Sequence, residues 1–170
     1  MPRMIALVTY ETPFAPCGGI AAVMGRLPAA LDRTARCQVV VITPYHRRIG
    51  ATSSARAEMK PAGSVTVQRA GEQARVDILR HPGRGGYVVP HYFLAPHDDG
   101  AFAGVRHPYD VPADTLLDDA LLFGSAVVRA TERIAPRAEW LLMVHDWEAA
   151  TAALAAQGAR HRAFLTLHNS

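Results

Sequence analysis

Residues 4–19 read MIALVTYETPFAPCGG, and this stretch decides the fold. It begins as an apolar run that predicts a buried strand, continues as a proline-containing loop, and ends at Gly18 and Gly19. From Ile20 to Leu31, apolar residues recur at i, i+3, i+4, i+7 and i+11, which predicts an amphipathic helix with a kink at Pro28. A strand, a loop and a helix in this order are typical of a parallel α/β sheet.

The same alternation of strands and helices continues to the end of the sequence. Helical spacing predicts one helix capped by Asp114 and another that starts at Asp146 and ends at Gly158. Residues 51–61 are expected to form an exposed loop. Apolar runs predict four further strands, at residues 37–43, 87–94, 140–144 and 163–167. Pro90 indicates an edge or irregular position for the strand at 87–94.

A β-hairpin interrupts this alternation. Valines alternate with polar residues on both sides of residues 70–72, which is typical of two short antiparallel strands. We therefore predict an α/β fold, a Rossmann-like doubly wound parallel sheet with a small β-hairpin insertion.

Size and composition exclude several classes of protein. With 170 residues and 49% hydrophobic residues, the chain is one domain of ordinary size or a large incomplete one. No apolar run reaches the ~18 residues of a membrane helix, and the first residues do not resemble a signal peptide. A scattered net charge of +3 argues against nucleic acid. We expect a cytoplasmic protein in which Cys17 and Cys37 are reduced thiols.

Polar clusters follow three of the predicted strands at the point where the chain leaves the sheet. They are the loop 10–19, His145-Asp146 and His168-Asn169. Because the carboxyl ends of parallel strands meet at one edge, and ligands bind at that edge, we expect the three clusters to share a site.

Two kinds of chemistry are compatible with these clusters. Gly18 and Gly19 allow close approach of a ligand, and the following helix start suits phosphate or a sugar oxygen, although the pair can also form an ordinary tight turn. His145 can donate to a substrate hydroxyl or stabilise developing charge, or it can be structural. We expect Asp146 to cap a helix and Trp147 to pack. His168-Asn169 can bind sugar or simply end a strand.

One acidic stretch has part of the composition of a metal site. It reads His97-Asp98-Asp99-Gly100. Its potential ligands lie in a glycine-containing loop without supporting partners, so a solvated loop is the preferred interpretation and no metal is predicted.

Taken in order, these segments resemble the glycogen/starch synthase family of GT-B glycosyltransferases. The resemblance rests on MIALVTYETPFAPCGGIAAVMGRLPAAL, CQVVVITPYHRRI, VPHYFLAPHDDGAF, HPYDVPADTLLDDALLFGSAVV, VHDWEAATAAL and FLTLHN. It implies the N-terminal half of a GT-B fold. It also implies transfer of glucose from ADP-glucose to the non-reducing end of an α-1,4-glucan, with retention and without a metal or cofactor.

The resemblance assigns roles to the residues of the three clusters. Gly18 and Gly19 would lie near the donor phosphates, and His145 would be the catalytic residue beside the transferred sugar. The supporting residues of the cleft would be Asp146, His168 and Asn169.

Two positions depart from the family pattern. Pro16 stands where the family carries lysine, and Ala22 stands where it carries aspartate. The lysine supplies a point charge for phosphate, so its loss bears directly on activity.

The resemblance also predicts how the chain is organised. Residues 1–170 would be an incomplete N-terminal Rossmann-like domain, with the C-terminal nucleotide-sugar domain absent and the isolated chain inactive. Two alternatives remain open. One is a non-catalytic glucan- or nucleotide-binding module that pairs with another chain. The other is an unrelated α/β nucleotide-binding or interaction domain, such as a flavodoxin-like protein.

Overall fold

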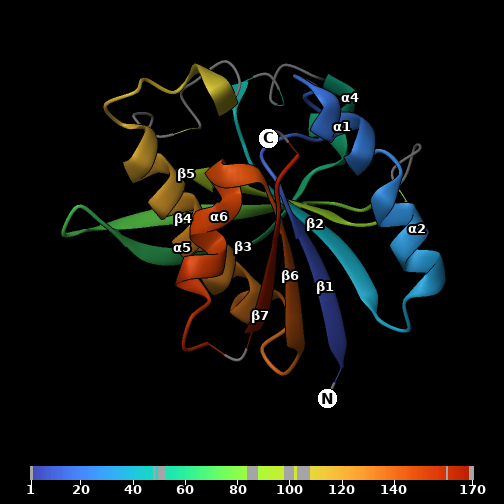
Figure 1. Cartoon of the computed structure of the whole chain (residues 1–170). Coiled ribbons are helices and arrows are strands. Elements are labelled where there is room, and N and C mark those ends of the chain that lie inside the picture. The colour runs from blue at the N-terminus through green and yellow to red at the C-terminus, as the bar shows by residue number, and fades with distance from the viewer. Residues whose placement is uncertain are drawn as a thin grey trace.

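The computed structural model describes residues 2–47, 49, 53–83, 88–97, 102, 108–159 and 161–168. Within these residues the centre is a seven-stranded sheet in the order β3-β4-β5-β2-β1-β6-β7 (Figure 1). The strands are β1 (Arg3–Val8), β2 (Gln38–Pro44), β3 (Lys60–Arg69), β4 (Glu72–His81), β5 (His91–Pro96), β6 (Glu139–His145) and β7 (His161–Thr166).

The sheet is parallel from β5 to β7, and the β3-β4 hairpin extends one edge of it antiparallel to β5. This arrangement confirms the predicted α/β sheet with its hairpin insertion. It also explains why the hairpin alternates in polarity, whereas the parallel strands are continuously apolar.

Helices cover both faces of the parallel strands (Figure 1). Met4, Ala6 and Val8 of β1 pack in the cluster that includes α5 and α6, whereas Ile5 and Leu7 pack in the cluster that includes α1 and α2. Because successive side chains of a strand point to opposite faces, a strand covered on both sides needs an unbroken apolar run. The helices are α1 (Gly19–Met24), α2 (Leu27–Thr34), α4 (Ser53–Glu58), α5 (Leu116–Ile134) and α6 (Asp146–Ala155), and Pro108–Asp110 form the 3-10 turn η2.

Two predictions of local structure are corrected, one of a helix and one of a loop. The helix expected from Ile20 to Leu31 is divided into α1 and α2, and Pro28 is the second residue of α2 rather than a kink. At that position a missing N–H costs nothing, because the first turn has no intrahelical acceptor for it. The loop expected at 51–61 is also wrong, because α4 and the start of β3 occupy most of it. The expected exposure is confirmed for residues 56–58, 60 and 61.

Of the two positions predicted for Pro90, an edge or an irregular one, the structure bears out the irregular one. Pro90 precedes β5, and β5 lies between β4 and β2 rather than at an edge. The carbonyl of Pro90 accepts the backbone N–H of Val41, so the proline joins the ladder only as an acceptor. Tyr87, where this strand was expected to begin, lies outside the described residues.

The ends of the two long helices also differ from their predictions. Thr115 rather than Asp114 occupies the N-cap of α5. Helix α6 ends at Ala155, and Gly158 follows in the next turn with a φ of +84°. That left-handed conformation favours glycine, although the glycine does not end the helix where the sequence suggested.

Helix α6 is held against α5 at a close crossing. A Cβ atom added at Gly124 would lie 2.5 Å from the backbone carbon of Thr151, so only glycine fits there. The hydroxyl of Thr151 donates to the carbonyl of Ala120 in α5. This contact fixes α6, whose N-terminus adjoins His145.

Strand β7 is an edge strand with exposed apolar side chains. It pairs with β6, and its other side pairs with no described strand. Phe164, Leu165 and Leu167 are 60%, 47% and 64% exposed. An open strand edge beside apolar side chains favours association with other chains.

We predict that the free chain self-associates through β7. Light scattering after size exclusion should detect species larger than a monomer, and the double substitution Phe164→Lys, Leu167→Lys should restore the monomer. Leu117→Lys is the control, because Leu117 is 66% exposed but lies on α5. A sharp parent monomer with a cooperative, high melting transition would contradict the prediction.

Candidate functional site

The carboxyl ends of β1, β6 and β7 lie at one edge of the sheet, where the sequence predicts the candidate site. The ladders pair Val8 with Val144 and His145 with Thr166, so the three strands end at nearly the same level. Nδ1 of His145 lies 2.7 Å from Nε2 of His168. The predicted juxtaposition of these two strand ends is confirmed, whereas Asn169 lies outside the described residues.

Glu11 organises the glycine loop after β1, and the sequence did not reveal it. Its Oε2 accepts the N–H groups of Gly18 at 2.6 Å, Cys17 at 3.3 Å and Ala21 at 3.4 Å. Its Oε1 accepts the hydroxyl of Tyr109 at 2.8 Å, and burial together with this bond raises the pKa of that phenol. The buried carboxylate therefore joins the loop to the segment around η2.

The hydrogen bonds of Glu11 give Gly18 and Gly19 different surroundings. The N–H of Gly18, which we expected to be available to a phosphate, already donates to Glu11, and a Cβ atom at Gly18 would lie 3.1 Å from Oε1. A Cβ atom at Gly19 would meet no atom of the described residues within 4 Å. Gly19 is therefore the glycine beside which the structure leaves space.

His145 is a buried, neutral imidazole. It is 2% exposed, and burial, aided by the neighbouring His168 and opposed by Asp146, lowers its pKa to about 4. Its ring stacks on that of His168 with centroids 5.1 Å apart and planes at 19°. Within the described part of the chain, Nε2 of His145 has no hydrogen-bond partner.

Asp146 ties the ends of β6 and β7 together. Its Oδ1 accepts the backbone N–H of His168 at 2.7 Å. Its φ is +62°, a left-handed conformation that residues other than glycine rarely adopt and that costs on the order of 1–3 kcal/mol. The predicted capping role is wrong, because His145 occupies the N-cap of α6 and no side-chain capping bond forms there.

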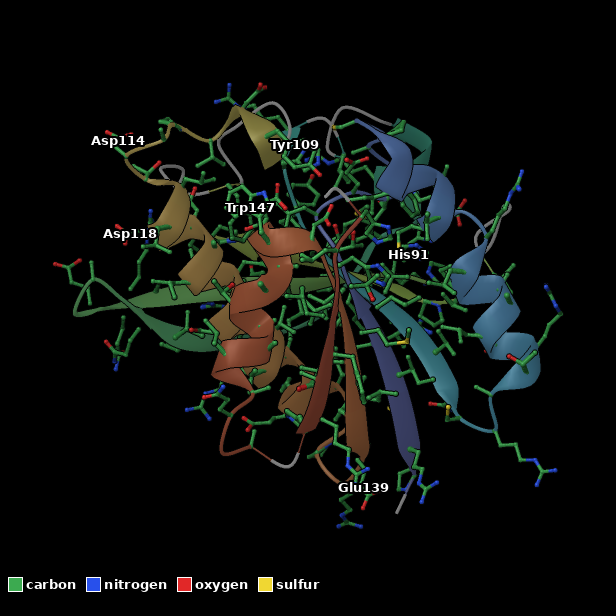
Figure 2. All side chains as sticks on the ribbon, viewed as in Figure 1. His91, Tyr109, Asp114, Asp118, Glu139 and Trp147 are labelled. Atoms are coloured by element: carbon green, nitrogen blue, oxygen red, sulfur yellow. The ribbon has the colours of Figure 1, made fainter. Side chains whose placement is uncertain are left out.

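Further polar groups surround this corner of the site. Glu148 is buried, and burial together with the carboxylates of Asp146 and Glu11 raises its pKa. Trp147 is 54% exposed, so the packing role expected from the sequence is wrong. Figure 2 shows Trp147 and Tyr109 at the same end of the sheet.

Aromatic packing at Phe14 anchors the loop that follows β1. The ring of Phe14 packs edge-on against His81, His91 and Phe93, with centroids 4.9 Å, 5.1 Å and 5.2 Å away. His91 donates from Nδ1 to the carbonyl of Val89 at 2.9 Å. Burial lowers the pKa of His91 to about 4, opposed by this bond and aided by His81.

The structure also bears on the predictions about metal ligands, membrane helices and cysteines. Among the described residues, no cluster of His, Cys, Asp and Glu could hold a metal ion, and no helix is long and apolar enough to cross a membrane. His97 contacts Asp77, with 2.7 Å between Nε2 and Oδ2, and the rest of its acidic stretch lies outside the described residues. Cys17 and Cys37 are not joined in a disulfide bond.

Comparison with known proteins places this site in a family. The starch synthase catalytic domain family matches residues 4–170. The chain belongs to this family. It is 28% identical over 149 residues to a glycogen synthase of Thermosipho africanus, and 29% identical over 147 residues to a glycogen synthase of Thermosipho melanesiensis.

Both alignments of this starch synthase family member cover 85% of the chain, but they cover 29% and 28% of the two relatives. The chain therefore spans less than a third of the length of these curated relatives. The family resemblance expected from the sequence is confirmed.

We predict that Glu11 stabilises the glycine loop through its charge. Glu11→Gln keeps the size of the side chain but replaces one carboxylate oxygen by an NH2 group, which donates hydrogen bonds and cannot accept them. The free energy of unfolding should fall by about 1.5–3 kcal/mol, the usual range for hydrogen bonds to a charged group. Urea denaturation measures this change.

Glu132→Gln is the matched control, because Glu132 forms an exposed ion pair with Arg129. Its cost should stay below about 0.5 kcal/mol. Equal costs for the two variants would show that the Glu11 carboxylate does not hold the loop.

We predict that acid destabilises the Phe14 anchor through His91. The pKa of His91 is about 4 in the folded chain and about 6.5 in the unfolded chain, so the unfolded chain binds more protons between these values. Stability is fully present above pH 6.5 and falls as the pH drops towards 4. Between pH 7.5 and 5, His91 should account for about 2 kcal/mol of lost unfolding free energy.

His91→Asn removes this titration while keeping a donor for the Val89 carbonyl. Denaturation curves at the two pH values should therefore show about 2 kcal/mol less acid destabilisation in this variant than in the parent. The same loss in both proteins would count against the role of His91.

Proposed function

We propose that this chain forms one wall of the glucosyl-transfer site of a glycogen/starch synthase. The reaction would move glucose from ADP-glucose to the non-reducing end of an α-1,4-glucan, with retention. The observation that carries the proposal is the family match over residues 4–170, together with the His145–His168 pair at the carboxyl edge of the sheet. The relatives named glycogen synthase support the reaction class.

In this proposal His145 is the residue that touches the sugar. Its imidazole is buried and neutral, and its Nε2 has no partner within the described residues, so a substrate group can satisfy it. A preorganised side chain in such a position can bind a hydroxyl or stabilise charge as the bond to ADP breaks. Asp146 and His168 hold its surroundings, and Asn169 stays part of the proposed site from the sequence alone.

The glycine loop would lie on the donor side. Gly19 leaves space for a ligand to approach the backbone, whereas Gly18 is bound to Glu11. We therefore assign the close approach of the donor to Gly19, with Gly18 as the residue that shapes the loop. No metal or cofactor enters the proposed reaction.

We further propose that residues 1–170 act with a C-terminal nucleotide-sugar domain, in the same polypeptide or in a partner chain. The exposed apolar strand β7 and the short share of the relatives' length support this. A site with one wall neither excludes water nor orients donor against acceptor. A cytoplasmic location remains a prediction from the composition.

A second candidate function is a non-catalytic glucan- or nucleotide-binding module. Pro16 and Ala22 favour it, because they replace the lysine and aspartate that the family carries in and after the same loop. The loss of a lysine removes a point charge suited to phosphate.

The test joins residues 1–170 to the remaining part of an active relative. We expect ADP release from ADP-glucose in the presence of glycogen by the chimera, and none by the chain alone. Within the chimera, His145→Ala should lower turnover by ~10²-fold or more, the scale expected for loss of a preorganised electrostatic contact.

His161→Ala is the matched control, because His161 lies at the opposite end of β7 and contacts Thr131. It should leave turnover near that of the parent chimera. Circular dichroism must show both variants folded at the assay temperature. Full activity of His145→Ala would return His145 to a structural role, whereas an inactive chimera that still binds glucan would favour the second candidate.

A further inference from the structure

The bond between His145 and His168 requires one proton between two rings. Nδ1 of His145 and Nε2 of His168 are 2.7 Å apart, and the ring planes differ by 19°. In a hydrogen bond between neutral imidazoles, one nitrogen donates and the other accepts. The position of that proton decides whether the second nitrogen of His145 is a donor or an acceptor.

Two arrangements satisfy the bond. When Nδ1–H of His145 donates, Nε2 of His145 is a bare acceptor. When Nε2–H of His168 donates, His145 carries its own proton on Nε2. In both cases that Nε2 is buried without a partner among the described residues.

The cost of an unpaired buried group favours the first arrangement. Buried N–H groups without an acceptor are rarer in proteins than acceptors that lack a donor. Placing the proton of His145 on Nδ1 leaves an unsatisfied lone pair, whereas placing it on Nε2 leaves an unsatisfied N–H. This preference favours the arrangement in which the proton between the rings belongs to His145.

The backbone of His168 is tied to the residue that follows His145. Oδ1 of Asp146 accepts the N–H of His168 at 2.7 Å, and Asp146 directly follows His145 in the chain. The left-handed φ of Asp146, +62°, directs the chain into α6. Asp146 thus links the backbones of the two strand ends that carry the histidines.

We propose that His168 is a positioning residue that holds His145 in the Nδ1–H tautomer, so that Nε2 of His145 accepts a hydrogen bond from a hydroxyl group of a sugar ligand. This specifies an acceptor where the sequence left open a donor or a charge-stabilising group. The ligand class rests on the proposed function, whereas the tautomer rests on the geometry alone. No proton leaves or enters the pair in this arrangement.

The tautomer is tested by NMR on the full chain with ¹⁵N-labelled histidine. Long-range ¹H–¹⁵N correlations separate protonated from bare ring nitrogens, and His145→Gln assigns the signals by their loss. At pH 7.5 the parent should show His145 with a protonated Nδ1 and a bare Nε2. The opposite pattern overturns the proposal.

Two variants of His168 separate positioning from packing. His168→Phe keeps a flat ring but removes the acceptor, so the Nδ1–H pattern of His145 should be lost. His168→Gln offers an oxygen acceptor at about the reach of Nε2 and should restore the pattern. Persistence of the Nδ1–H tautomer in His168→Phe overturns the positioning role, and His161→Phe, away from the pair, should leave the His145 signals unchanged.

Two sugar probes then test the acceptor role. ADP-glucose or maltotetraose, added to the parent chain, should shift the Nε2 signal of His145 while leaving that of His161 in place. A protonated Nδ1 without a shift from either probe overturns the sugar-acceptor role and leaves the tautomer standing. Turnover of the active chimera is measured separately, so failure of the proposed reaction is distinguished from failure of the tautomer.

Discussion

Strand β1 is the constraint on which the rest of the structure depends. It is paired on both sides, with β2 and β6, and covered on both faces, so it has no freedom to shift along its axis. A slip of one residue would exchange its two apolar faces and break both ladders. The level at which β1 ends therefore sets the level at which β6 ends. The pairing of β6 with β7 sets the level at which β7 ends in the same way.

Buried polar side chains lie where the chain leaves the sheet at that level, and each of them needs hydrogen-bond partners within the protein. Glu11 is satisfied by backbone N–H groups and a phenol, and Asp146 by the backbone of His168. Burying such groups is tolerated only when hydrogen bonds replace those lost to water. The positive φ of Asp146 follows from the same need, because it places the carboxylate where the N–H of the neighbouring strand end is available.

The sequence predicts the parts of this structure that arise from periodicity. The apolar runs correctly indicate the strands, and the rule that ligands bind at the carboxyl ends correctly brings His145 near His168. Local preferences fail where tertiary bonds compete with them. Aspartate favours helix caps, yet Asp146 bonds to a residue 22 positions away, and no pattern of nearby residues records that contact.

Glu11 could not be found from the sequence for a related reason. Its partners at the loop are backbone N–H groups, which every residue except proline carries, so they leave no mark in the amino-acid pattern. The division into α1 and α2 was missed because the apolar spacing continues through Gly25 and Arg26, where the chain is no longer helical.

The charges around His145 suggest how the proposed site is divided between its two walls. The groups that the structure places near this residue are His168 and the acidic side chain of Asp146, and Asp146 together with Glu11 lies close enough to Glu148 to raise its pKa. A nucleotide sugar carries two phosphates, which such surroundings repel rather than attract. Pro16 also adds no positive charge at the loop. In the proposed reaction the phosphates would therefore find their positive partners outside these surroundings, and this wall would contact sugar hydroxyl groups through neutral hydrogen bonds. Such a division would accommodate Pro16 at the position where the resembled family carries lysine.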